Sequence, residues 1–411
     1  MTKNVFDVLK ERGFIAQATD EDAIRRWLSG QGITFYIGYD NTALSLHAGS
    51  LVPTMAMMHL QRAGHRPIAL VGGGTTMVGD PSGRTELRQL LDEETIRANG
   101  RAIHSQLNRY LHFDAGQAIS VDNADWLLDL NYIAFLREIG RHFSVNRMLA
   151  AEAYQLRLER GLSFIEFNYQ LLQAYDFLHL FRTYNCTMQM GGDDQWGNIL
   201  AGVDLIRRVE GKEAHAMTFP LLTTASGAKM GKTAAGAVWL DAELFSPYSF
   251  YQYWVNCDDR DVERFLKLFT FLPMDEIACL SALQGADLRE AKQVLAYEAT
   301  KITHGLEEAE RAQAAAHAAF NRDGDPDAIP TTALPAGRLR EGVAVLEVFV
   351  EVGLAPSRRE ARRMMEQGGV YVNDQRIQDP EALLTESDIT AEGILLRAGK
   401  KKHRRLLISD A

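Results

Sequence analysis

The sequence predicts an α/β protein that begins with a doubly wound parallel sheet and continues into helical segments and a small C-terminal unit. Two apolar, β-branched runs at 33–40 and 67–74 flank an amphipathic stretch at 51–64, which is the order of a βαβ unit. Helical patterns fill 247–321. A run dense in Pro, Gly and Asp at 321–342 then indicates a linker, because long loops without structure are uncommon inside compact domains.

The length and composition are those of a multidomain globular protein. A chain of 411 residues is long for one domain and predicts two or three. No apolar run approaches the roughly 20 residues that a membrane-spanning helix needs, and the N-terminal residues lack the apolar core of a signal peptide. The 3 cysteines form no CxxC pair, so neither a disulfide framework nor a zinc site is indicated. We therefore expect no structural metal and a reducing, cytoplasmic location.

The net charge of −10 argues against loose, charge-driven binding to nucleic acid. The C-terminal part is an exception, because the basic run at 397–405 contains no acid. Its basic positions, with those of a preceding helical segment, are Arg358, Arg359, Arg362, Arg363, Lys400, Lys401, Lys402, Arg404 and Arg405. Two interpretations are open: a solvated charged surface, or a local patch that binds RNA phosphates.

The first strand–helix–strand unit places two acids where a ligand is expected. Side chains alternate along a strand at 33–40, so Tyr36, Gly38 and Asp40 lie on one face. The second strand runs into a polar loop that contains Asp80. Ligands of doubly wound sheets bind at the carboxyl ends of the strands, where both acids lie.

The remaining elements follow in chain order. An opening helical region covers Val5–Leu28, and residues 85–185 are mostly helical. A strand is expected to return within 187–198, followed by a helix from about Gln195. The segment 217–240 indicates a strand, a loop rich in Gly and Ala, and a short strand.

The segment LHAGS at 46–50 places His47 and Gly49 just before a helix. A helix N-terminus offers unpaired N–H groups and a partial positive charge, which suit a phosphate. Glycine lets a nucleotide approach the backbone, and histidine can donate to a phosphate oxygen. The alternative is a capped helix with an incidental histidine.

The segment KMGKT at 229–233 places Lys229 and Lys232 in a glycine-rich loop. Two ammonium groups there can meet the pyrophosphate of ATP as negative charge develops on it. The spacing differs from that of a Walker A motif. The alternative is a solvated surface loop.

Two further segments carry polar groups at telling positions. On the apolar helix 164–181, the polar residues Tyr169, Gln173 and Asp176 recur at i, i+4 and i+7 and therefore share one face. Two interpretations are open: this face lines a pocket for an amino acid, or it is an exposed polar stripe. In GGDDQWGN, Asp193 is expected to cap a helix and Asp194 to accept ribose hydroxyl hydrogens.

Seven segments, taken together and in this order, resemble those of bacterial tyrosyl-tRNA synthetases, which are class I aminoacyl-tRNA synthetases. They are FYIGYDNTALSLHAGSL, GHRPIALVGGGTTMVGDPSG, HFSVNRM, SFIEFNYQLLQAYDF, GGDDQWGN, KMGKT and SPYSFYQYW. The tail around SRREARRMMEQGGVYVNDQRI resembles an S4-type RNA-binding module. The resemblance implies a Rossmann-like catalytic domain with a helical insertion over 1–246, a helical anticodon-arm domain over 247–321, a linker over 322–342 and an S4-like α+β RNA-binding domain over 343–411.

The resemblance also implies roles for individual positions. Tyr36 and Asp176 match the pair around the phenolic hydroxyl of tyrosine. The positions around its ammonium and carboxylate groups are Tyr169, Gln173, Asp80 and Gln195. The implied ATP-binding positions are Gly38, Asp40, His47, Gly49, Ser50, Gly192, Asp194 and Lys232. The implied catalytic positions are Thr42, His47, Lys229, Lys232 and Thr233.

The implied activity is a ligase reaction in two steps. L-Tyrosine attacks ATP, which is bound with Mg²⁺, to give tyrosyl-adenylate and diphosphate, and the tyrosyl group then passes to the 3′ end of tRNA(Tyr). A homodimer is also implied, and we expect its interface in the segment 127–149. The apolar residues at helical spacing there are Tyr132, Phe135, Leu136, Ile139 and Phe143.

Two positions depart from the family pattern. Ser50 stands where a second histidine is usual, and Ile37 replaces a polar residue often found beside the ribose. Met230–Gly231 departs from the Met-Ser of the superfamily, but glycine at that point is common in this family. Three alternatives to the ligase also remain: an RNA-binding paralogue without catalysis, a synthetase for tryptophan, and a plain nucleotidylyltransferase. The lysines of KMGKT and His47 argue against the first, and the phenol-directed pair Tyr36 and Asp176 argues against the second.

Overall fold

The computed structural model describes most of the chain. The described residues are 3–82, 91–150, 154–155, 158, 161–225, 227, 230–233, 236–321, 329–373, 375–390, 393–399 and 402–409, with only the main chain at 232–233, 319–321 and 341. The chain forms two compact units. The first unit contains residues 1–232, 237–241 and 258–282, and the second unit contains 233–236, 242–257 and 283–411.

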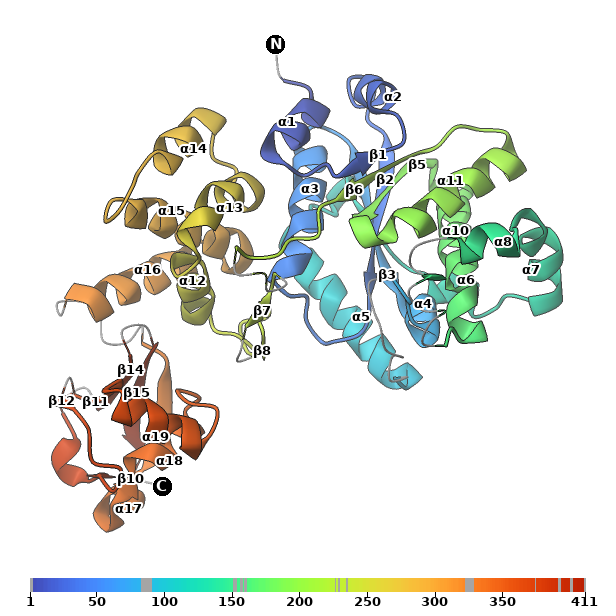
Figure 1. Ribbon diagram of the computed structural model, residues 1–411. Coiled ribbons are helices and arrows are strands. Elements are labelled where there is room, and N and C mark those ends of the chain that lie inside the picture. Colours follow the sequence, from blue (N-terminus) through green and yellow to red (C-terminus); the bar gives the residue numbers. More distant parts are fainter. Residues whose placement is uncertain are drawn as a thin grey trace. The chain divides into compact units, whose positions relative to one another are not determined.

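The first unit is built on a six-stranded sheet (Figure 1). Its strands are β1 (Gln17–Ala18), β2 (Thr34–Asp40), β3 (Arg66–Gly72), β4 (Ile119–Asp122), β5 (Cys186–Gly192) and β6 (His215–Phe219), in the spatial order β1-β6-β5-β2-β3-β4. All neighbours are parallel except the edge pair β1 and β6. The chain leaves β2 first toward β3 and β4 and later returns on the other side of β2 to β5. Strand order therefore reverses between β2 and β5, which is where a doubly wound sheet binds its ligand.

Helices cover both faces of this sheet, with α3 and α5 on one side and α10 and α11 on the other (Figure 1). The helices of the first unit are α1 (Val5–Arg12), α2 (Glu21–Trp27), α3 (Leu51–Arg62), α4 (Gly73–Val78), α5 (Glu93–Leu107), α6 (Ala124–Leu127), α7 (Tyr132–Glu138), α8 (Val145–Leu149), α10 (Phe164–Tyr184), α11 (Trp196–Glu210), α13 (Val262–Phe269) and α14 (Met274–Ser281). The longest, α10, begins at a capping box in which Ser163 and Glu166 satisfy each other's main chain. Its apolar residues join Tyr36 and Ile68 in one buried cluster, so α10 is held against the sheet centre.

The second unit combines helices with a smaller sheet. Helices α12 (Pro247–Val255), α15 (Leu288–His304) and α16 (Leu306–Asn321) pack on one another. The five-stranded sheet has the order β12-β11-β14-β15-β9, with β9 (Thr331–Pro335), β11 (Val370–Val372), β12 (Gln375–Arg376), β14 (Ile394–Ala398) and β15 (Lys402–Ser409). Around it lie α17 (Ala336–Glu341), α18 (Val345–Glu351), α19 (Arg358–Glu366) and the pair β10 (Val343–Ala344) and β13 (Leu383–Leu384). Two short strands, β7 (Lys232–Thr233) and β8 (Gly236–Ala237), occur where the chain passes between the units.

The structure confirms the strands expected at 33–40 and 67–74, the helix between them, and the strand and helix around Gln195. It differs at three places. The opening segment is two helices separated by β1, and β4 lies inside a stretch expected to be mostly helical. The linker expected over 322–342 is wrong in its described part, because β9 pairs in parallel with β15 and α17 follows it.

That last pairing joins segments about 70 residues apart, so no local pattern reveals it. Residues 322–328 of the expected linker lie outside the described part of the chain. Among the helices that the structure describes, none combines the length and apolarity needed to cross a membrane.

Candidate active site

Asp176 forms the floor of the site beside β2. This carboxylate projects from α10 and is 1 % exposed. One of its oxygens accepts a hydrogen bond from Asn123 Nδ2 at 2.9 Å, and the other accepts one from Trp126 Nε1 at 2.7 Å. Burial raises the pKa of Asp176 to about 7, although both donors act in the opposite direction. The site therefore holds an acceptor that titrates close to neutrality.

Tyr36 lies on β2 close to that carboxylate. Its ring is buried against Phe177, with 5.4 Å between the ring centroids. Burial, and then the charge of Asp176, raise the pKa of the Tyr36 phenol well above its usual value. Within the described residues its hydroxyl has no hydrogen-bond partner. A buried hydroxyl without a partner is costly, and a hydroxyl on a bound ligand would satisfy it.

Asp80 forms a second buried acidic position, at the loop after α4. Its carboxylate accepts hydrogen bonds from Gln195 Nε2 at 2.6 Å and from the main-chain N–H of Ser82 at 2.9 Å. Burial, and then the charge of Asp40, raise the pKa of Asp80 to about 6. Asn198 Nδ2 donates in turn to Gln195 Oε1 at 3.2 Å. The loop and the start of α11 are thus joined by one polar network.

The polar residues of α10 are directed inward. Tyr169 and Asp176 are buried and Gln173 is half-buried. The Gln173 side-chain oxygen is buried and, among the described residues, without a partner. These positions are therefore not an exposed polar stripe. They lie on the face of α10 that packs toward β2 and β5.

The segment LHAGS at 46–50, called the first signature below, has a defined local geometry. His47 precedes a 3₁₀ turn (Ala48–Ser50), and its Nδ1 accepts a hydrogen bond from the Gly49 N–H at 3.0 Å. Because Nδ1 accepts this bond, a neutral ring carries its proton on Nε2. Ser50 is half-buried at the start of α3, and Thr42 is exposed in the preceding loop.

The segment KMGKT at 229–233, called the second signature, contacts the first signature through a glycine of each. A Cβ on Gly231 would lie 2.8 Å from the Gly49 nitrogen, and Gly231 has φ +79. The main chain of Val238 binds both segments, accepting from Ala48 N–H and donating to the Gly231 carbonyl oxygen, each at 2.8 Å. Lys229 lies outside the described residues, and for Lys232 and Thr233 only the main chain is described.

The carboxyl ends of the central strands leave the backbone accessible. Gly38 is exposed, whereas Ile37 beside it is buried on the other face. A Cβ on Gly192 would lie 2.6 Å from Asp194 Oδ1. The expected helix-capping role of Asp193 is wrong. Its carboxylate instead accepts hydrogen bonds, and the donors are Gln17 Nε2 at 2.8 Å and Thr218 Oγ1 at 2.6 Å.

Sequence reasoning missed Asn123 and Trp126, which donate to Asp176, and Asn198, which donates to the Gln195 that binds Asp80. Asn123 and Trp126 follow β4 directly, at the same sheet edge as Asp40. Recognising ISVD as a strand would have marked DNADW as an edge segment by the rule that identified Asp40. Gln189 was also missed. It lies beside Tyr36 in the sheet, and its buried side-chain oxygen is without a partner among the described residues.

The basic residues of the second unit are only partly as expected. The four arginines of α19 are exposed, and three of them form ion pairs: Arg358 with Glu347, Arg362 with Glu381 at 3.7 Å, and Arg363 with Glu360 at 2.6 Å. On β15, Lys402 is exposed and Arg404 is half-buried, and burial lowers the pKa of Arg404. Arg405 is buried, so its expected place in an RNA-facing patch is wrong. Lys400 and Lys401 lie outside the described residues.

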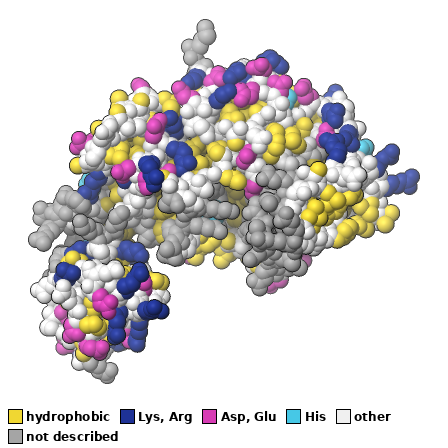
Figure 2. Space-filling view, in the orientation of Figure 1, with side chains coloured by type: hydrophobic (Ala, Val, Ile, Leu, Met, Phe, Trp, Pro, Cys, Tyr) yellow, Lys and Arg dark blue, Asp and Glu magenta, His cyan; other side chains and the backbone are white. Residues whose placement is uncertain are grey.

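The apolar segment 127–149 is not one helix but α7, a 3₁₀ turn and α8. Phe135 and Ile139 belong to the core of the first unit, so they do not form an exposed stripe. Other apolar side chains are exposed instead, and Figure 2 shows hydrophobic atoms gathered around α7. The exposed apolar patch consists of Leu128, Tyr132, Ile133, Val145, Phe164 and Ile165.

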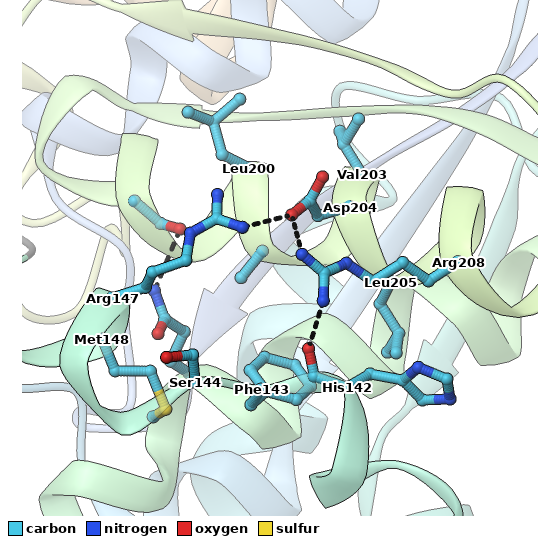
Figure 3. Close-up of a pocket in the computed structure, with 13 residues that line it drawn as sticks. His142, Phe143, Ser144, Arg147, Met148, Leu200, Val203, Asp204, Leu205 and Arg208 are labelled. Atoms are coloured by element: carbon cyan, nitrogen blue, oxygen red, sulfur yellow. Dashed lines mark hydrogen bonds and ion pairs between the residues drawn. The ribbon is translucent and has the colours of Figure 1, made fainter.

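A separate pocket of about 330 Å³ lies between α8 and α11. Figure 3 shows Arg147 and Arg208 directed toward Asp204, with Arg208 also donating to the carbonyl oxygen of His142 at 2.9 Å. Among the described residues, the lining of this pocket includes none of the expected tyrosine- or ATP-binding positions. We therefore place the candidate active site in the crevice expected at the carboxyl ends of β2 and β5, where the strand order reverses.

Comparisons with known proteins agree with this geometry. The chain matches the family described as tRNA synthetases class I (W and Y) over residues 29–321 and the tyrosine–tRNA ligase SYY-like C-terminal domain over 326–406. It is 56 % identical over 420 residues to the tyrosine–tRNA ligase of Syntrophus aciditrophicus (strain SB), covering 98 % of each chain. It is 54 % identical over 428 residues to that of Desulfosudis oleivorans, covering 98 % of this chain and 99 % of the relative.

A solved structure is similar as well. The C-terminally truncated mitochondrial tyrosyl-tRNA synthetase of Aspergillus nidulans superposes with a TM-score of 0.70 at 31 % identity, over 77 % of this chain and 94 % of that chain. The C-terminal part of the chain is covered by the family match over 326–406 and by the two tyrosine–tRNA ligases. The chain belongs to the bacterial tyrosyl-tRNA synthetase family of class I aminoacyl-tRNA synthetases.

Proposed function

We propose that this chain forms tyrosyl-adenylate in the crevice at β2 and β5 and then transfers the tyrosyl group to the 3′ end of tRNA(Tyr). The observation that carries the proposal is the buried Asp176 carboxylate beside the unpartnered Tyr36 hydroxyl. The phenolic hydroxyl of a bound tyrosine satisfies both groups, because it can donate to the Asp176 carboxylate and accept from the Tyr36 hydroxyl. The indole of tryptophan has no acceptor for Tyr36.

The amino group of the substrate binds at the other end of the same crevice. Asp80 supplies a negative charge for the ammonium group, and Tyr169 and Gln173 supply polar atoms from the inward face of α10. Gln195 is held by Asp80 and Asn198 and is assigned to the carboxylate of the substrate. The substrate is therefore fixed at both ends, which leaves its carboxylate directed toward ATP.

ATP enters as its magnesium complex. The exposed backbone at Gly38 admits the nucleotide, and Gly49 and Gly192 are assigned to it because neither position has room for a side chain. Asp194 is assigned to the ribose. His47 Nε2–H, with Thr42, donates to the phosphates. The hydroxyl of Ser50 reaches less far than the imidazole it replaces, so we assign it only a supporting contact. Asp40 is assigned to the nucleotide side of the crevice because its charge acts on Asp80.

The first step then needs no covalent nucleophile on the protein. The tyrosine carboxylate attacks the α-phosphorus, a new P–O bond forms, the bond to the β-phosphate breaks and diphosphate leaves with the electron pair. Lys229, Lys232 and Thr233 stabilise the charge that moves onto diphosphate. In the second step a ribose hydroxyl of the tRNA attacks the tyrosyl carbonyl and AMP leaves.

The exposed apolar patch is assigned to a second copy of the chain. Ile133 and Phe164 are each 70 % exposed, and large apolar patches of this kind mark protein interfaces. The patch belongs to the first unit and α19 to the second, and we assign the arginines of α19 to an RNA surface. The ion pairs of those arginines are solvent-exposed and therefore weak, so phosphates can replace their carboxylate partners.

Charging of tRNA tests the proposal as a whole. The protein should attach tyrosine to tRNA(Tyr), and ATP, tRNA and tyrosine should all be required. An RNA-binding paralogue without catalysis would bind the tRNA and release no AMP. That result would overturn the proposal while leaving the fold unchanged.

A further inference from the structure

Side chains at the start of helix α13 form hydrogen bonds with the main chain that leads into KMGKT. Asp261 stands directly before this helix, where a side chain commonly caps its own helix. Its carboxylate instead accepts a hydrogen bond from the main-chain N–H of Ala225 at 2.8 Å. Its other oxygen binds Arg264 at 2.7 Å, and Arg264 donates to the carbonyl oxygen of Thr223 at 2.5 Å. Two neighbouring side chains thus hold one three-residue segment by its backbone.

That segment is connected to the ATP crevice by further backbone contacts. The Met230 N–H donates to the Leu222 carbonyl oxygen at 2.9 Å, so the chain entering the signature and the signature itself lie side by side. Gly231 then packs against Gly49 of the first signature. A displacement at Thr223–Ala225 is therefore transmitted to the position of Gly231.

Helix α13 is itself a fixed support. Arg12 in α1 donates to the carbonyl oxygens of Lys267 and Thr270 at 3.0 and 2.9 Å, at the C-terminal end of α13. Asp261 is 3 % exposed, and a buried carboxylate is costly unless it is paired. Here both of its oxygens are engaged in charge-assisted or main-chain hydrogen bonds, which are strong and directional. Asp261 is thus buried and bonded through both oxygens, unlike the carboxylate of an exposed ion pair.

We propose that Asp261, together with Arg264, is a positioning residue for adenylate formation. It touches neither substrate. It fixes the main chain that enters KMGKT, so that the lysines of this segment meet the diphosphate as it leaves. The inference rests on the proposed role of KMGKT, and its test must separate the two.

The first measurement is tyrosine-dependent ATP–diphosphate exchange with Asp261→Ala and Asp261→Asn. Asp261→Ala should lower kcat by roughly tenfold or more, because a hydrogen bond from a charged group is lost, and should leave the KM for tyrosine within about twofold. Asp261→Asn keeps one acceptor for Ala225 and should fall between. Arg260→Ala, which breaks the exposed pair with Asp258 in the same turn, is the matched control and should behave as the unmodified protein. An equal loss in KM and kcat, or an Asn variant no better than Ala, would overturn the inference.

The second measurement is a double-mutant cycle with Lys232→Ala. Lys232→Ala alone should slow exchange strongly, and adding Asp261→Ala should then cost less than about twofold, because the charge being positioned is already absent. If the double variant shows the full product of the two single rate reductions, Asp261 acts independently of Lys232 and the inference is wrong. If Lys232→Ala leaves exchange unchanged, the proposed role of KMGKT fails instead. Should Asp261→Ala not fold, Arg264→Ala carries the same cycle, since that side chain is 42 % exposed.

Discussion

The indole N–H of Trp126 donates to Asp176 at 2.7 Å, from a residue that lies just beyond β4. This bond helps to keep a deeply buried carboxylate available as an acceptor. Burial raises the pKa of Asp176 to about 7, and each donor that contacts the ionised form lowers it. The affinity for tyrosine should therefore depend on pH near neutrality.

Trp126→Phe should shift the pH profile of tyrosine activation. The variant keeps an aromatic ring and loses one donor to Asp176, so the pKa of the carboxyl group rises further above its usual value. A protonated Asp176 cannot accept the phenolic hydrogen in the same way, so kcat/KM falls as pH decreases, and this fall should begin at higher pH in the variant. The measurement is kcat/KM for tyrosine between pH 5.5 and 9, which reports groups of the free enzyme. An unchanged acidic limb would contradict the role of Trp126.

Gly231→Ala should abolish most adenylate formation. The added Cβ would lie 2.8 Å from the Gly49 nitrogen, and the φ of +79 is itself unfavourable for alanine. Neither glycine is among the positions assigned to tyrosine, so tyrosine binding measured by equilibrium dialysis should change little. Gly227→Ala is the control, because it has a similar φ of +84 and nothing within 4 Å of its Cβ. Equal activity of the two variants would mean that contact between the signatures is unimportant.

Ile133→Asp should convert the proposed dimer into a monomer. The side chain belongs to the exposed apolar patch and is 70 % exposed, and a second copy would bury the new charge without a partner. Light scattering at micromolar concentration measures the mass directly. Leu407→Asp, an exposed apolar position in the second unit, should leave the mass unchanged. A monomeric unmodified protein would refute the assignment.

A protein ending at residue 321 should still form tyrosyl-adenylate, because the crevice and both signatures precede that point. It should lose most charging of tRNA(Tyr), since the arginines of α19 are removed. Binding of the full chain to tRNA should weaken steeply between about 50 and 200 mM salt as counterions are released. Full charging by the shortened protein would show that the C-terminal residues do not contact the tRNA productively.

Local patterns predicted the elements that build the floor of the crevice. The alternation around Tyr36 marked β2, and the i, i+4, i+7 spacing on α10 brought Tyr169, Gln173 and Asp176 to one inward face. The donors to Asp176 could not be predicted in this way. Asn123 and Trp126 lie about 50 residues before it and reach it only because β4 joins the edge of the sheet.

The same limitation explains two further errors. Strands β9 and β15 are neighbours in the C-terminal sheet but lie about 70 residues apart in the sequence, so the segment around Thr331 was mistaken for a linker. Arg405 was assigned to a basic surface because charge patterns do not reveal which side of a strand is covered. In both cases the decisive contact is distant in sequence, and residue composition does not record it.

ATP–diphosphate exchange, measured separately with tyrosine, phenylalanine and tryptophan, tests the central claim most directly. If Tyr36 and Asp176 hold a phenolic hydroxyl, tyrosine supports exchange, whereas phenylalanine leaves two buried polar groups unpaired and should have a kcat/KM at least about a hundredfold lower. Tryptophan should support almost none, and Asp176→Asn should lose most of the tyrosine activity. Comparable exchange with phenylalanine, or full activity of a folded Asp176→Asn variant, would contradict the account.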